Sequence, residues 1–170
     1  MIDFSDTTNE GAGVIYRQLS NPVNDWRGLH CAFDLTLPPF KQVLYYSPPF
    51  DHWPVACCRM HPYVTDDMGV LEEGGAFILL KTGHGYLGLL PFALRDVYGW
   101  FSPDENGLKL RVGNHGTENL PNEKPVLAWC SSADPYEVFA ETFRQATSLI
   151  PEARLREDKA YPEPFYYLGG

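Results

Sequence analysis

The sequence predicts a mostly β fold, an antiparallel β-sandwich followed by one helix near the C-terminus. Three observations support it: segments that alternate apolar and polar side chains, short continuous apolar runs, and glycine-containing turns between them. These segments lie at 14–19, 30–37, 75–81, 86–94, 97–101, 108–112 and 126–130. We expect roughly eight short strands in all, because such spacing is typical of a sandwich rather than of alternating strands and helices.

Residues 30–37 show the clearest period of two. Cys31, Phe33 and Leu35 alternate with polar or small neighbours, so one face of this strand is expected to be buried and the other to meet solvent. The continuous apolar runs suit strands that are covered on both faces. Two glycines within 81–85 predict the tip of a hairpin between two of these runs.

A helix is expected to begin after Asp134. Asp134 is a good N-cap, Pro135 suits the first helical position, and Glu137 completes a capping box. The apolar stripe that we expect to pack on the sandwich consists of Phe139, Phe143, Ala146 and Ile150. The chain therefore divides into a β-sandwich over 1–132 and a helix with a linker over 133–170.

Composition excludes several classes of partner. The formal net charge is -9 and only 13 residues are Lys or Arg, so we expect no nucleic-acid or anionic-membrane surface. Neutral ligands suit the chain better. No apolar run reaches the roughly 18 residues of a membrane span, so we expect a soluble protein and leave open whether it is cytoplasmic, periplasmic or secreted.

The most specific motifs lie near the C-terminus. Ala-Asp-Pro-Tyr-Glu-Val at 133–138, then a helix and a charged linker, lead to Tyr-Pro-Glu-Pro-Phe-Tyr-Tyr-Leu-Gly at 161–169. This order resembles the approach to the catalytic barrel in raffinose synthases, seed imbibition proteins and family 36 α-galactosidases. The paired runs at 75–81 and 85–92 extend the resemblance to about three quarters of the chain. Gly170 stands where those families place the first tryptophan of a Trp-Cys-Thr-Trp motif.

The resemblance implies a sandwich of the galactose mutarotase-like type that precedes a (β/α)8 barrel. In such families the nucleophile and the acid/base residue sit on the barrel, so no catalytic residue of this chain is expected. The implied role is that of a noncatalytic domain that supports its own C-terminal barrel, with galactose-containing oligosaccharide as a further possible partner and no cofactor. A free-standing carbohydrate-binding module is the alternative. A mutarotase-like enzyme would need a His and Glu constellation that the sequence does not single out.

The candidate sugar-facing or barrel-facing residues are Tyr46, Asp51, His52 and Trp53. They lie in a proline-framed segment, 45–54, and Trp53 falls where family members carry a tryptophan pair. Aromatic faces can pack against sugar C–H groups while the polar side chains bond hydroxyls. The alternative, which we favour, is that these aromatics cover the edge of the sandwich or meet the barrel.

Two other clusters are expected to carry no chemistry. His52, Cys57, Cys58 and His61 lack the spacing of a zinc site, so we expect no metal and interpret the cysteines, with Cys31 and Cys130, as buried thiols. Acidic residues such as Asp51, Asp66, Asp67, Glu72 and Glu73 could be drawn as a glycosidase pair. We expect a solvated acidic loop instead, since 22 acidic residues make such neighbours common.

Overall fold

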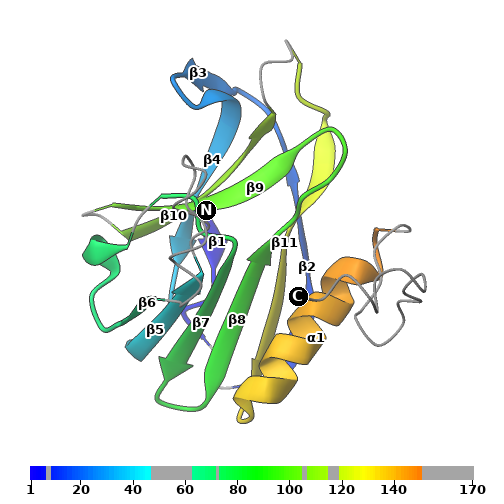
Figure 1. The fold of residues 1–170 in the computed structure, drawn as a ribbon. Coiled ribbons are helices and arrows are strands. Elements are labelled where there is room, and N and C mark those ends of the chain that lie inside the picture. Colours follow the sequence, from blue (N-terminus) through cyan, green and yellow to red (C-terminus); the bar gives the residue numbers. More distant parts are fainter. Residues whose placement is uncertain (7–8, 47–62, 72, 105–106, 115–118, 151–170) are drawn as a thin grey trace, which may run out of the picture.

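The computed structural model describes residues 1–6, 9–46, 63–71, 73–104, 107–114 and 119–150. Two β-sheets pack face to face, and one helix lies on the outer face of the second sheet (Figure 1). The predicted mostly β sandwich with one C-terminal helix is thereby confirmed. All seven strand segments expected from the sequence correspond to strands.

The first sheet has the strand order β1-β4-β10-β9, with β3 paired to β4. Its strands are β1 (Ile2–Asp3), β3 (Val23–Asp25), β4 (Gly28–Thr36), β9 (Tyr98–Asp104) and β10 (Gly107–Asn114). β1 runs parallel to β4, and the other pairings are antiparallel. Because side chains alternate along a strand, β4, β9 and β10 each send one set inward and another outward.

The second sheet has the order β2-β11-β8-β7-β5-β6. Its strands are β2 (Gly11–Gln18), β5 (Phe40–Tyr46), β6 (Tyr63–Thr65), β7 (Phe77–Thr82), β8 (Tyr86–Pro91) and β11 (Glu123–Ser132). The expected hairpin tip at 81–85 joins β7 to β8, with Gly85 at φ 150°. A side chain there would collide with the backbone of Ser132, 2.6 Å from an added Cβ.

The main core lies between the two sheets. Phe101 and Leu110 from the first sheet are fully buried, as are Leu80 and Leu89 from the second. Each fully buried side chain of this size contributes roughly 1.5–3 kcal/mol of hydrophobic stabilisation. Cys31 and Cys130 are buried thiols, as expected.

Helix α1 (Pro135–Thr147) contacts β11, β8 and β2. Asp134 caps it by accepting a hydrogen bond from the Tyr136 N–H at 2.9 Å, as the sequence predicted. The second hydrogen bond of the predicted capping box, from the Asp134 N–H to the Glu137 carboxylate, is replaced by two bonds through Ser132. The Asp134 N–H donates to Ser132 Oγ at 3.3 Å, and the Ser132 hydroxyl donates to Glu137 at 2.6 Å.

The buried face of α1 is shifted from the predicted stripe. Val138, Thr142 and Ala146 are buried, whereas Phe139 is 44% exposed and Phe143 is half-buried. Only Ala146 of the predicted stripe is therefore buried.

Among the described residues, no helix is long and apolar enough to cross a membrane.

Candidate functional site

The residues singled out from the sequence are only partly placed. Asp51, His52 and Trp53 lie outside the described residues. Tyr46 is the last residue of β5, where its backbone pairs with Phe77 of β7, and its side chain also lies outside the description. The proposed sugar-facing or barrel-facing role of these four residues stays a prediction.

The outer face of the first sheet carries a cluster of charged and aromatic side chains. His30, Trp100 and Arg111 come from three adjacent strands and share this face because β10 pairs Arg111 with Trp100 and Gly113 with His30. Gly113 is required here, because an added Cβ would lie 2.4 Å from the Leu29 carbonyl oxygen. Strands β4 and β10 therefore approach each other closely beside His30.

Glu73 lies at the centre of this cluster. Its position is set by the next two residues, since Gly74 N–H donates to the Phe101 carbonyl at 2.8 Å and the Phe101 N–H donates to Gly75 at 3.0 Å. Arg27 donates to both carboxylate oxygens, from Nε at 2.6 Å and from Nη2 at 3.0 Å. Such forked pairing is the strongest form of carboxylate recognition.

Two further groups approach the same carboxylate. The Trp100 indole N–H donates to Glu73 Oε1 at 3.0 Å, and Arg111 Nε lies 3.7 Å from that oxygen, an ion-pair distance. Arg111 Nη1 lies 2.7 Å from His30 Nε2. Because a guanidinium can only donate, Nε2 accepts and the ring proton is assigned to Nδ1, which donates to the Gly28 carbonyl at 3.0 Å.

The cluster fixes the charge of Glu73. Burial is the largest influence and raises its pKa, but the hydrogen bonds from Arg27 and Trp100 and the charges of Arg27 and Arg111 outweigh burial, so the pKa is lowered. The carboxylate is therefore ionised at neutral pH and held by cations, which does not suit a general acid. The expected solvated acidic loop is wrong for Glu73, while Asp66 and Asp67 are exposed as expected.

Sequence reasoning missed the turn that carries Arg27. Trp26 lies at the tip of the β3–β4 hairpin and is 81% exposed, with the Arg27 guanidinium carbon 4.2 Å from the centre of its ring. Asp25 accepts from the Arg27 side chain at 3.0 Å and from its backbone N–H at 2.8 Å. An aromatic residue in the middle of Asn-Asp-Trp-Arg-Gly, a polar turn motif, was the available signal.

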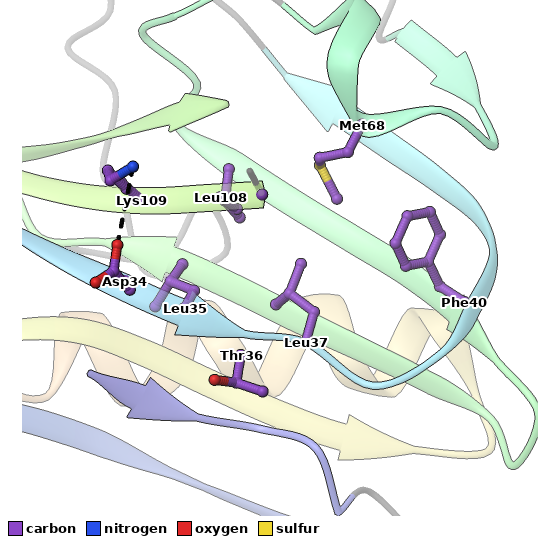
Figure 2. A pocket seen from close by; sticks show the side chains of 9 residues that line it. Asp34, Leu35, Thr36, Leu37, Phe40, Met68, Leu108 and Lys109 are labelled. Atoms are coloured by element: carbon purple, nitrogen blue, oxygen red, sulfur yellow. Dashed lines mark ion pairs between the residues drawn. The ribbon is translucent and has the colours of Figure 1, made fainter. Parts of the chain in front are cut away.

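A pocket of about 430 Å³ opens where β4, β5 and β10 meet the 3₁₀ helix η2 (Met68–Val70). Figure 2 shows Asp34 and Lys109 at one side of it, and Phe40 and Met68 at the other. The Asp34–Lys109 ion pair spans 3.9 Å. Apolar side chains dominate the lining, so the pocket offers shape and hydrophobic contact with few polar groups.

A second pocket, of about 750 Å³, lies between residues 94–98 and 119–121. Asn114 lines it and donates from Nδ2 to the Asn119 carbonyl at 3.1 Å. The half-buried Tyr98 ring also lines it and stacks on Trp100 at 5.0 Å between ring centres. This pocket therefore adjoins the aromatic part of the Glu73 cluster.

Among the described residues, no group of three or more His, Cys, Asp or Glu side chains could hold a metal ion. No protein-family model matches the chain, and no curated protein matches it.

Proposed function

We propose that the chain is a noncatalytic β-sandwich domain of a carbohydrate-active glycoside hydrolase or transglycosidase, and that it supports a C-terminal (β/α)8 barrel of a longer parent protein. Its order of elements supports this role. A two-sheet sandwich is followed by one helix on an outer face, and then by the 161–169 motif that resembles the approach to a barrel in α-galactosidases and raffinose synthases.

The observation that carries the proposal is the outward face of α1. Tyr136 is 84% exposed and Phe139 is 44% exposed, and Phe139 lies 4.7 Å from Phe143 and 5.2 Å from Phe77 between ring centres. The neighbouring outer face of the second sheet adds the exposed Val64 of β6. An aromatic surface of this kind is typical of contact with another domain.

The state of Glu73 also favours a supporting role. Glycoside hydrolysis needs one protonated carboxylic acid and a second carboxylate beside the sugar. Glu73 is committed to Arg27 and Trp100, and its lowered pKa keeps it ionised. Its place in the sandwich is that of a structural anion.

A free-standing carbohydrate-binding module is the second candidate, and the exposed Trp26 favours it. The two candidates differ in whether the protein carries a barrel and in what the α1 surface contacts. Reading the gene beyond Gly170 distinguishes them first. The supporting-domain role requires an in-frame barrel after the 161–169 motif.

The experiment has two arms. The chain alone, assayed with chromogenic α- and β-galactosides and glucosides, should give no turnover; turnover that a Glu73→Gln or Asp34→Asn change abolishes would contradict the proposal. In the parent, Phe139→Ser should lower the melting temperature more than it does in the chain alone, because it removes a contact with the barrel. Trp26→Ser, at the far end of the sandwich, is the matched aromatic control. Equal shifts for Phe139→Ser in parent and chain would refute the α1 contact.

A further inference from the structure

The β3–β4 hairpin presents one aromatic ring at the end of the first sheet. Its strands pair Val23 with His30 and Asp25 with Gly28, so Trp26 and Arg27 form the turn (Figure 1). Gly28 has φ 86°, a conformation that glycine adopts without strain. The turn is short, and its geometry is set by the Asp25 carboxylate that accepts from the Arg27 N–H at 2.8 Å.

Arg27 holds the ring of Trp26 from one side. Three of its N–H groups donate to Glu73 and Asp25, and its guanidinium carbon lies over the indole, 4.2 Å from the ring centre. Cation–π contacts of this kind contribute about 0.5–1 kcal/mol at exposed sites. A side chain ordered in advance loses little entropy when a ligand binds.

We propose that Trp26 is the stacking platform of a binding site for a neutral sugar ring, with the polar side chains of the hairpin as partners for its hydroxyls. A single exposed indole is too small for a protein interface, which buries about 800 Å² on each partner. It matches the area of one pyranose ring, whose C–H face packs on the π surface. The site specifies a ligand for the proposed carbohydrate-active domain, and it rests on that proposed function.

The charges at the hairpin favour a neutral ligand over an anionic one. The carboxylates of Glu73 and Asp25 neutralise Arg27. The backbone hydrogen bond from Arg27 is the main influence that lowers the pKa of Asp25, so this carboxylate stays ionised. Asn24 and Asp25, in the same hairpin as Trp26, are both exposed. They supply an amide and a carboxylate, which are the usual partners of sugar hydroxyls.

The test is a titration of the intact chain with raffinose, melibiose and galactose. Binding is monitored through the indole N–H signals of the four tryptophans in ¹H–¹⁵N NMR spectra. Trp26→Ala assigns the Trp26 signal and should weaken binding at least tenfold. Trp26→Tyr should retain most of the affinity, since it keeps an aromatic face. Tyr136→Ala removes an equally exposed ring on α1 and should leave affinity unchanged.

Three outcomes would overturn the site. Saturable binding that Trp26→Ala leaves unchanged would place the sugar elsewhere. No shift of any indole signal at about 50 mM sugar, roughly fifty times a Kd of about 1 mM, would rule out neutral sugars as the ligand. A Trp26→Ala change that destabilises only the parent would make Trp26 a domain contact instead. None of these results changes the turnover assay or the Phe139→Ser comparison between parent and chain, and the last one only removes Trp26→Ser as a control, so failure of this site and failure of the proposed function can be told apart.

Discussion

Glu73→Gln removes the charge at the centre of the cluster with little change in shape. Glutamine offers one acceptor oxygen where Glu73 uses two, for Arg27 and Trp100. Its amide N–H₂ would face an N–H of Arg27 or Trp100, so at least one donor loses its partner. Arg111, 3.7 Å from Oε1, would also lose its ion pair.

The expected loss lies between two limits. Breaking a fully buried ion pair costs about 3–5 kcal/mol, whereas an exposed pair contributes about 0–1 kcal/mol. The side chains of Arg27 and Glu73 are 21% and 26% exposed, which places the cluster between these cases. We therefore expect Glu73→Gln to lower the free energy of unfolding by about 2 kcal/mol at pH 7.

Urea denaturation measures this difference by linear extrapolation. Asp34→Asn is the control, because it makes the same chemical change on the same sheet in a 3.9 Å pair whose carboxylate is 69% exposed; we expect a loss below about 0.5 kcal/mol. A loss for Glu73→Gln no larger than that of Asp34→Asn would refute the reasoning from partial burial.

The pH dependence supplies a second check. Although burial is the largest influence on Glu73 and raises its pKa, its hydrogen bonds and nearby cations lower it below the ordinary value of 4.5. Its contribution is therefore complete above the unfolded-state pKa and is lost as the pH falls through the lower folded-state pKa. The difference between wild type and Glu73→Gln should be constant from pH 7 to 5 and shrink below 4.5. A difference that stays constant at lower pH would assign the loss to packing.

Two further predictions concern the second sheet. Gly88→Ala would place a Cβ 2.7 Å from Val138 Cγ1 and 2.8 Å from Thr142 Oγ1. We therefore expect urea denaturation to show a free energy of unfolding lower by about 1–3 kcal/mol, partly restored by Val138→Ala. An unchanged free energy of unfolding for Gly88→Ala would mean that α1 does not pack on β8 as described. Cys130 is buried, and burial above all, with nearby carboxylates, raises its pKa to about 11. Iodoacetamide at pH 8 should therefore label Cys130 far more slowly in the native chain than in urea, by peptide mapping, and equal rates would contradict its burial.

Strands with a period of two could be predicted from the sequence, and short or interrupted ones could not. Burial alternates over residues 31–36 of β4 and over residues 107–112 of β10. β5 was missed because Lys41 and Gln42 interrupt its apolar residues directly after Pro38 and Pro39. β1 and β3, with two and three residues, are too short for a pattern to register.

The helix was predicted correctly, but its buried face was not. The spacing of apolar residues favoured a stripe that includes Phe139 and Phe143, whereas the sheet beneath α1 presents Gly88, which lets the helix approach closely. Only the smaller Val138 and Thr142 fit at that distance. Thr142 tolerates burial because its hydroxyl donates to the Val138 carbonyl at 2.7 Å, so the polar atom is satisfied within the helix.

The Glu73 cluster could not be predicted from local patterns, since Arg27 and Glu73 lie 46 residues apart and meet only after the first sheet forms. A contribution of about 2 kcal/mol is modest beside a core of this size, so stability alone is a weak reason to bury part of a carboxylate and two guanidinium groups. Orientation is a stronger one. A lysine would supply the same charge as Arg27, but it lacks both the forked N–H groups that bind the two Glu73 oxygens and the planar guanidinium that lies over the Trp26 ring. The cluster therefore connects the outer face of the first sheet to the exposed ring of Trp26.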